Sequence, residues 1–135
     1  MIDNQLQEIK NNFLLFDNQL DKFEYLIEIG KSCKGIKEDN KIEKNQIMGC
    51  ASKSWVICNK KNNHYLIEVD SEAHIVRGLL EILKFATNKK SQDEIIDLNG
   101  MNMLKEIGIG NSITSQRMNG FLSALNTVKS IVRKS

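Results

Sequence analysis

Hydrophobic residues recur at helical spacing in two consecutive stretches near the start of the chain. The two apolar stripes are, in chain order, Leu6, Ile9, Phe13 and Leu14, then Leu20, Phe23, Leu26 and Ile27. Apolar residues three and four positions apart predict amphipathic helices. Asp17 has a side chain suited to capping the start of the second helix, and Gly30 is of the type that commonly ends one. We therefore expect two consecutive helices before residue 31.

From Ser54 onward the pattern becomes that of β-strands. The apolar residues at 55–58 are followed by a polar, turn-forming segment at 59–63 and then by a second apolar stretch at 65–69. Two such stretches across a short turn predict an antiparallel hairpin. Trp55 and Ile57 fall on the same face of this hairpin, and the size of the indole favours a core position for Trp55.

After the hairpin the pattern predicts helices again. Asp70 or Ser71 is expected to cap a helix that ends near Asn88, and Ser91 to begin a shorter one. Another short helix is expected around Leu104, then a loop at the glycines 108 and 110, then a last helix capped by Thr114. The stripes of the two long helices are Ile75, Val76, Leu79, Leu80 and Leu83, then Met118, Phe121, Leu122, Leu125, Val128 and Val132.

This order of elements predicts an α+β fold. Helices on one side of a small antiparallel β-sheet would bury both the helix stripes and one face of the strands. No repeat or low-complexity linker interrupts the chain, and the polar stretch from Lys37 to Gln46 is short enough to be a surface connection. We expect one domain over residues 1–135.

Composition and charge exclude several classes of function. The 135 residues are 41% hydrophobic and 27% charged, as in globular proteins. Nineteen basic and seventeen acidic residues leave a net charge of +2 without a dense basic block, so nucleic-acid binding is not expected. No apolar stretch approaches the ~18 residues of a membrane span, and the N-terminus resembles no targeting peptide. A cytoplasmic protein without membrane association is expected.

The cysteines are the residues most suited to chemistry. The chain has an odd number of cysteines: Cys33, Cys50 and Cys58. Because no export signal precedes them, a disulfide framework is not expected. They form no Cys-x-x-Cys pair, and the isolated His64 and His74 have no ligand-like spacing, so we expect no metal site. At least one cysteine is then a candidate for a working thiol.

Cys50 is the best candidate because of its neighbours. It lies in Met48-Gly49-Cys50-Ala51-Ser52, between the polar connection and the first strand. Glycine and small residues on a tight loop leave a side chain accessible, which suits a reactive thiol. The competing interpretation is a cysteine that packs as a small hydrophobe, which is the commoner fate of a free cysteine.

Four spaced segments resemble the SufE family. The loop GCASKSW at 49–55 is similar to the family's active loop, usually written Gly-Cys-Gln-Ser-x-Val-Trp. The segment DSEAHIVRGL at 70–79 is similar to Asp-Ser-Asp-Ala-x-Ile-Val-Lys-Gly-Leu, and SQRMNG at 115–120 resembles Ser-x-Arg-x-Asn-Gly. Residues 16–30 resemble the family's opening helix. Four matches in the right order are hard to obtain by chance.

This chain departs from the family pattern at two positions of the active loop. Ala51 replaces the usual Gln, and Ser54 replaces the usual Val, whereas Glu72 keeps the acidic character of the corresponding Asp. The thiol is retained. These departures therefore concern the packing of the loop and the choice of partner more than the chemistry.

The resemblance implies transpersulfuration. As a thiolate, Cys50 would attack the sulfane sulfur of a persulfide on a cysteine desulfurase and pass the sulfur to iron-sulfur cluster assembly. The implied partners are a SufS-type, PLP-dependent desulfurase and a scaffold complex of the SufBCD type, and a homodimer is also compatible. The protein would be a persulfide-carrying activator without a cofactor of its own. Its fold should resemble SufE and the IscU scaffolds, whose set of ligand cysteines is missing here.

The resemblance also implies roles for residues around Cys50. Arg117 matches the family's Arg and is expected to support the thiolate or to hold the loop; the alternative is a solvated Arg at a helix start. For Glu72, the helix dipole alone also explains an acidic side chain in the first turn of a helix. The residues expected to contact the partner are Gly49, Ala51, Ser52 and Glu72.

Two other functions compete with the sulfur carrier. One is a thiol-based redox protein in which Cys33 or Cys58 resolves an oxidised Cys50. It is disfavoured because a strand, and not a helix, follows Cys50. The other is a binding module in which Cys50 is structural. For the carrier, we expect Cys50 at rest to lie in an apolar pocket near the hairpin and the last helix, which would raise its pKa.

Overall fold

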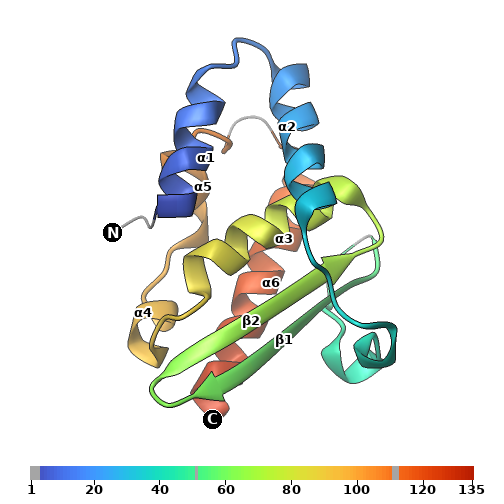
Figure 1. The fold of residues 1–135 in the computed structure, drawn as a ribbon, viewed down its shortest axis with the longest axis vertical. Coiled ribbons are helices and arrows are strands. Elements are labelled where there is room, and N and C mark those ends of the chain that lie inside the picture. Colours follow the sequence, from blue (N-terminus) through green and yellow to red (C-terminus); the bar gives the residue numbers. More distant parts are fainter. Residues whose placement is uncertain (1–3, 51, 111–112) are drawn as a thin grey trace.

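The computed structural model describes residues 4–50, 52–110 and 113–135. Its helices are α1 (Asn4–Leu14), α2 (Gln19–Ser32), α3 (His74–Thr87), α4 (Gln92–Ile96), α5 (Gly100–Glu106) and α6 (Ser115–Lys134). Its strands are β1 (Ser54–Lys61) and β2 (His64–Ser71), and two 3-10 turns, η1 (Glu38–Asn40) and η2 (Glu43–Asn45), precede them. The predicted α+β class is confirmed (Figure 1).

The two strands form an antiparallel hairpin with α3 and α6 behind it (Figure 1). The register runs from Ser54 opposite Ser71 to Lys61 opposite His64, so the hairpin is longer than the apolar pattern predicted. Asn62 in its turn has φ 58°, a left-handed conformation that asparagine tolerates well. Alternate residues of the strands are buried on the helix side. These are Val56, Tyr65, Ile67 and Val69.

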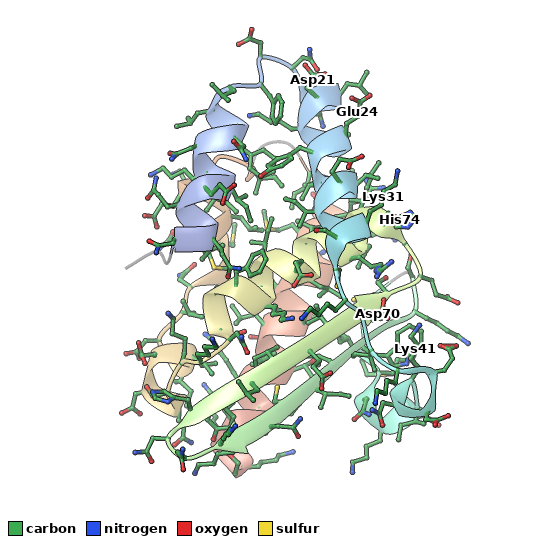
Figure 2. All side chains as sticks on the ribbon, viewed as in Figure 1. Asp21, Glu24, Lys31, Lys41, Asp70 and His74 are labelled. Carbon is green, nitrogen blue, oxygen red and sulfur yellow. The ribbon has the colours of Figure 1, made fainter. Side chains whose placement is uncertain are left out.

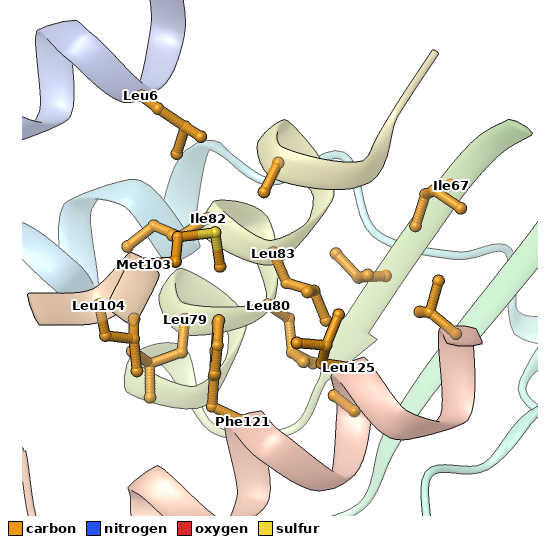
Figure 3. Packing of buried hydrophobic residues seen from close by; sticks show 14 of the residues in the cluster. Leu6, Ile67, Leu79, Leu80, Ile82, Leu83, Met103, Leu104, Phe121 and Leu125 are labelled. Carbon is orange, nitrogen blue, oxygen red and sulfur yellow. The ribbon is translucent and has the colours of Figure 1, made fainter. Parts of the chain in front are cut away.

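The core is built around α3, which packs against α2, the hairpin and α6. Leu79, Leu80 and Leu83 of α3 meet Phe121 and Leu125 of α6 in this core (Figure 3). Their burial confirms most of the helical stripes predicted for the second half of the chain. The other members are only partly buried: Ile75, Val76, Met118 and Leu122. A buried side chain of this size contributes roughly 1.5–3 kcal/mol, so this cluster is the main source of stability.

The predicted stripes of the first two helices are only partly correct. Leu14 and Leu20 remain 70% and 65% exposed, because they lie at the turn that joins α1 to α2 and project beyond the core. The cap is Asn18 instead of the predicted Asp17: its side chain accepts a hydrogen bond from Asp21 N.

Gly30 does not end its helix as predicted, since α2 continues to Ser32. Its role is the contact between α2 and α3. A Cβ atom on Gly30 would overlap the carbonyl oxygen of His74, and one on Gly78 would overlap that of Leu26. The two glycines therefore let the two helix backbones touch, a consequence of tertiary packing and not of helix termination.

Trp55 is buried, at 7% exposure, but on the other face from the predicted core. Alternation along β1 puts Val56 against the helices and Trp55 on the opposite side. There the connection that contains η1 and η2 covers it: Gln46 pairs with Trp55 across an isolated β-bridge, and Lys41 Nζ lies 5.3 Å from the centre of its ring. The connection thus forms a small second layer over the hairpin.

Asp70 fixes that layer to the hairpin and to α3, and does not cap α3 as predicted. The N-cap position is Ala73, without a side-chain cap. Asp70 Oδ2 accepts a hydrogen bond from Ile36 N at 2.9 Å and lies 3.3 Å from Lys41 Nζ (Figure 2). Asp70 Oδ1 lies 3.1 Å from Arg77 Nε. One carboxylate therefore holds the connection, β2 and α3 together.

The other alternative, Ser71, is likewise not a cap but the last residue of β2. Its hydroxyl accepts a hydrogen bond from Ala73 N at 3.3 Å, which shapes the turn into α3.

The caps predicted at Ser91 and Thr114 are both confirmed. Ser91 forms a capping box with Glu94, and Thr114 accepts from Arg117 N at 3.2 Å.

Candidate functional site

The loop that carries Cys50 is closed at its base by main-chain hydrogen bonds. Ile47 N donates to Ser54 O at 2.8 Å, so the chain returns to its starting point across residues 48–53. The carbonyl of Lys53 accepts two further bonds, from Glu72 N at 3.0 Å and from Ser71 Oγ at 3.2 Å. These hydrogen bonds join the base of the loop, which we call its stem, to the end of β2.

Gly49 is the first close contact of the loop with α6. Its φ of +87° is a backbone conformation that side chains rarely adopt, and a Cβ atom there would come within 3.0 Å of Ser123 Oγ. The turn thus requires glycine, and the contact with Ser123 leaves little room for a side chain. This agrees with the predicted place of Gly49 in the loop and gives it a structural reason.

Cys50 points toward α6 at the next contact. Its Sγ lies 3.8 Å from the carbonyl oxygen of Gly120 and 3.5 Å from the position that a Cβ on that glycine would take. Gly120 and Ser123 lie one helical turn apart on α6, so they offer the loop a face of small residues. The thiol is half-buried against this face of α6.

A cavity of about 220 Å³ opens beside the thiol between α3 and α6. Its walls are largely apolar, and Arg117 is the charged residue among those that line it in the described part of the chain. The lining residues, apart from Cys50 and Arg117, are Ser52, Ala73, Ile75, Val76, Leu79, Leu80, Thr114, Gln116, Gly120 and Phe121. The predicted pocket near the last helix is present, but α3 supplies its other wall in place of the hairpin.

Burial raises the pKa of the Cys50 thiol above its ordinary value, because it removes the thiolate from water. A hydrogen bond with the Ser54 side chain acts in the opposite direction and lowers the pKa. Burial dominates, so the thiol is largely protonated at neutral pH. The predicted quiet resting state of Cys50 agrees with this environment.

The other predicted site residues lie at different distances from the chemistry. Ser52 lines the cavity, and Glu72 sits at the loop stem, where its main-chain N binds Lys53 O. Arg117 also lines the cavity, and its guanidinium carbon lies 5.8 Å from the centre of the Phe23 ring. In this conformation burial raises the pKa of Cys50 and the Ser54 side chain lowers it, without a contribution from Arg117. Ala51 lies outside the described residues.

The other two cysteines are poorly suited to nucleophilic chemistry. Burial raises the pKa of Cys33 to about 11, assisted by Glu81, and raises that of Cys58 to about 12. Cys33 is held in the core, where its Sγ lies 3.6 Å from Val69 O, and Cys58 packs against the core from β1. Of the three thiols, Cys50 is the one that lines an open cavity.

Three residues near Cys50 were not predicted as parts of the site. Gly120 and Ser123 lie against the loop, and the Ser54 side chain lowers the pKa of the Cys50 thiol. The small residues at 120, 123 and 124 along one side of α6 were the available signal, because a helix face without large side chains often marks a close backbone approach. The apolar residues Ile75 and Val76 were assigned to the core, but they line the cavity.

The described residues contain no group of three or more His, Cys, Asp or Glu side chains that could hold a metal ion. Within the same residues, no helix combines the length and the apolar character needed to cross a membrane.

Comparison with known proteins agrees with the sequence motifs. A family model described as "SufE: Fe-S metabolism associated domain" matches residues 7–132. An uncharacterized SufE-like protein of Rhizobium etli is 33% identical over 128 residues, which cover 92% of this chain and 86% of that protein. A second one, from Rhizobium meliloti, is 31% identical, with 93% and 92% coverage.

A solved structure shows that the fold is not unique to this chain. The solution structure of a hypothetical protein from Thermus thermophilus superimposes with a TM-score of 0.76 and covers 99% of this chain and 97% of its own. The two sequences are only 16% identical, so the likeness concerns the fold alone.

Proposed function

Because the chain belongs to the SufE family and so to iron-sulfur metabolism, we propose that it accepts sulfur on Cys50 from a cysteine desulfurase. The observation that carries the proposal is the placement of Cys50. It is the one of the three cysteines that lies on a loop beside an apolar cavity, while Cys33 and Cys58 have strongly raised pKa values.

The transfer is a thiolate-persulfide exchange. The Cys50 thiol first loses its proton to solvent or to a group on the partner, and the thiolate attacks the outer sulfur of the desulfurase persulfide. A new S–S bond forms at Cys50 as the old S–S bond breaks, and the desulfurase cysteine leaves as a thiolate. No electrons are gained or lost overall. The product is a persulfide on Cys50, which cluster assembly would consume.

The cavity suits an intermediate of this kind. A persulfide adds one sulfur atom to Cys50, and a cavity of about 220 Å³ bordered by residues such as Leu79 and Phe121 has room for it. Apolar walls exclude water and soluble thiols, which would otherwise remove the sulfur. The open side of the cavity leaves a route to a partner.

Arg117 is proposed to act when the loop carries charge. It is the cation at the cavity, and a persulfide is anionic at neutral pH more readily than a buried thiol, so attraction between them would hold the loaded loop. The proposed partner surface is the loop itself with Gly49, Ala51 and Ser52, together with Glu72 at its stem. The partners would be a SufS-type, PLP-dependent desulfurase and then a SufBCD-type scaffold complex.

The decisive experiment is persulfide loading measured by intact mass. The protein is incubated with a SufS-type desulfurase and free cysteine, and we expect the mass of one sulfur atom to be added and mapped to the Cys50 peptide. Cys50→Ser should add none while it keeps its circular dichroism spectrum, because the exchange removes the nucleophile at little change of volume. Loading that persists in the folded Cys50→Ser protein would overturn the assignment.

The redox alternative makes a different prediction in the same assay. Peroxide treatment would then join Cys50 to Cys33 or Cys58, which gives a loss of two hydrogen atoms and no gain of sulfur. The raised pKa values of both partners oppose this reaction, since the attacking thiol must be ionised.

A further inference from the structure

The cavity beside Cys50 is larger than the proposed sulfur transfer requires. Its volume is about 220 Å³, whereas a persulfide adds only one sulfur atom to Cys50. In other proteins an apolar cavity of about 150 Å³ is large enough to hold benzene. The cavity therefore has room for a small organic molecule next to the thiol.

One part of the cavity is apolar and belongs to the core. Leu79 and Leu80 of α3 and Phe121 of α6 line it, and each is at most 2% exposed. Ile75 and Val76 of α3 also line it but are only partly buried, so they lie closer to the surface. A hydrocarbon group in contact with these side chains would be removed from water, which is favourable.

Three polar lining residues lie together at the start of α6. Thr114 is the N-cap of this helix, and Gln116 and Arg117 belong to its first turn. Phe121 follows Arg117 after one helical turn on the same face, so the wall changes from polar to apolar along the helix. A ligand that fits this wall has one polar end and an apolar body.

Arg117 gives the polar end a positive charge that no carboxylate of the described residues neutralises. The ion pairs among those residues do not include Arg117. Its guanidinium carbon lies 5.8 Å from the centre of the Phe23 ring, so an aromatic side chain of α2 supports the cation. A cation–π contact does not use the N–H donors, which stay available to an anion.

The Cys50 thiol borders the same cavity. Its Sγ lies 3.8 Å from the carbonyl oxygen of Gly120, which also lines the cavity and stands between Arg117 and Phe121 along α6. A molecule that contacts both the polar and the apolar part of this wall therefore passes beside the sulfur. Its presence would hide the thiol from a reagent or a partner.

We propose that the cavity is a binding site for a small monoanion with an apolar body, such as an aromatic or short aliphatic carboxylate. Its carboxylate pairs with Arg117 and accepts hydrogen bonds from the Thr114 hydroxyl or the Gln116 amide. Its hydrocarbon part packs against Phe121 and the apolar side chains of α3. The site does not depend on the proposed function, but a bound anion covers Cys50 and so regulates any reaction of that thiol.

The first test compares benzoate with benzamide, which has nearly the same shape but no charge. Binding is followed by NMR titration of the full-length protein, from the main-chain amide signals of Val76 and Gly120. We expect benzoate to bind with a Kd of about 1 mM or lower, and benzamide at least about tenfold more weakly, because it cannot pair with Arg117. Equal affinities, or no shift of these signals with benzoate, would overturn the proposal.

Acetate tests the apolar part of the site. It carries the same carboxylate but lacks the ring that packs against Phe121 and Leu79, so it should bind at least about tenfold more weakly than benzoate. If acetate bound as tightly as benzoate, the site would be no more than a general attraction of anions to Arg117, and the proposal would fail.

Arg117→Gln should weaken benzoate binding about tenfold and leave benzamide binding unchanged, because it removes the charge and keeps a hydrogen-bond donor. Arg133→Gln is the matched control. Arg133 is exposed in the last turn of the same helix, so the loss of its charge should change neither affinity. An equal loss in both variants, or none in Arg117→Gln, would contradict the site. If Arg117→Gln does not fold, the two wild-type titrations decide.

Alkylation of Cys50 by iodoacetamide, which is uncharged, shows whether the bound anion covers the thiol. At a benzoate concentration about ten times its Kd, the alkylation rate should fall about tenfold, in proportion to the fraction of empty cavities. Benzamide at the same concentration should slow the reaction much less. An unchanged rate with benzoate bound would overturn the placement of the site beside Cys50.

Sulfur loading separates this inference from the proposed function. Benzoate should slow persulfide formation on Cys50 by a SufS-type desulfurase, and sulfide release by the desulfurase alone with a soluble thiol is the control. If the wild-type protein takes up no sulfur while benzoate binds and protects Cys50, the proposed function fails and the anion site stands. If sulfur loads normally but benzoate does not bind, the inference fails alone.

Discussion

Cys50 Sγ lies 3.8 Å from the carbonyl oxygen of Gly120, a residue seventy positions further along the chain. The contact joins the loop to the second turn of α6. A sulfhydryl bond to a carbonyl is weak, so the contact holds the loop in place at rest without fixing it there.

Release of this contact should control the reactivity of Cys50. We expect slow alkylation of Cys50 in the isolated protein, because burial raises its pKa, and faster alkylation when a desulfurase is bound that lacks its own nucleophilic cysteine. Peptide mass spectrometry measures the two rates. Fast reaction in the isolated protein, with no further increase on binding, would contradict this gating.

The other two cysteines should be dispensable for sulfur transfer. Cys33→Ser and Cys58→Ser should load sulfur on Cys50 at near wild-type rates, since the pKa values of about 11 and 12 keep both thiols protonated. Each should lose some stability, about 1–3 kcal/mol, because a buried hydroxyl needs a partner that a thiol does not. Urea denaturation measures the cost. A folded variant that no longer loads sulfur would favour the resolving-thiol mechanism.

Asp70→Asn should destabilise the protein by roughly 1–3 kcal/mol at neutral pH, because it removes the charge that holds Lys41 and Arg77. Burial alone would raise the pKa of Asp70, but hydrogen bonds from Ile36 N and Ser71 N and the two cations lower it overall. The carboxylate's contribution is thus complete above about pH 4 and is lost as the pH falls through the lowered folded pKa.

The denaturation midpoints of wild type and Asp70→Asn should therefore differ most near neutral pH and converge in acid. Glu38→Gln is the matched control. Glu38 pairs with the same Lys41, at 3.1 Å, but its side chain is 84% exposed, so its removal should change stability little. If Glu38→Gln lost as much stability as Asp70→Asn, exposed charge and not the buried carboxylate would hold the connection in place.

Gly78→Ala should be strongly destabilising, by about 1–3 kcal/mol or more, because its Cβ would overlap Leu26 O where α2 and α3 touch. Gly120→Ala provides the contrast. There the Cβ would meet Cys50 Sγ at 3.5 Å, an ordinary contact, and alanine in a helix gains about 0.5–1 kcal/mol. Thermal denaturation of both variants checks the sign of each effect. Equal destabilisation would show that helix interiors here reject any side chain.

The elements of the fold were predictable because apolar spacing is a local property. The helices of the second half, the hairpin and the cap at Thr114 all follow from neighbours within a few positions. The role of Asp70 was not predictable in this way. Its carboxylate accepts a hydrogen bond from Ile36 N, 34 positions away, and is no longer available to cap α3. The residues next to position 70 in the sequence do not indicate that contact.

The two faces of the hairpin show a second limit of local patterns. Trp55, Val56 and Ile57 are all apolar, so alternation separates Trp55 from Val56 but does not say which of them meets the helices. In the candidate site, too, some residues follow from the local sequence and others only from the packing of distant elements. The motif identified Cys50 and Gly49, whereas the contacts with Gly120 and Ser123 depend on how α6 packs against the loop.

The closed base of the loop limits how far the Cys50 thiol can move. Between the bonded ends at Ile47 and Ser54, the chain has only residues 48–53, so even a fully straightened loop lifts its tip by about 10 Å. Carriers with long flexible arms visit distant active sites, whereas under the proposed function this loop would act at short range. Donor and recipient would each have to bring their reacting atoms to the surface of this protein, and the two would therefore take turns at one place.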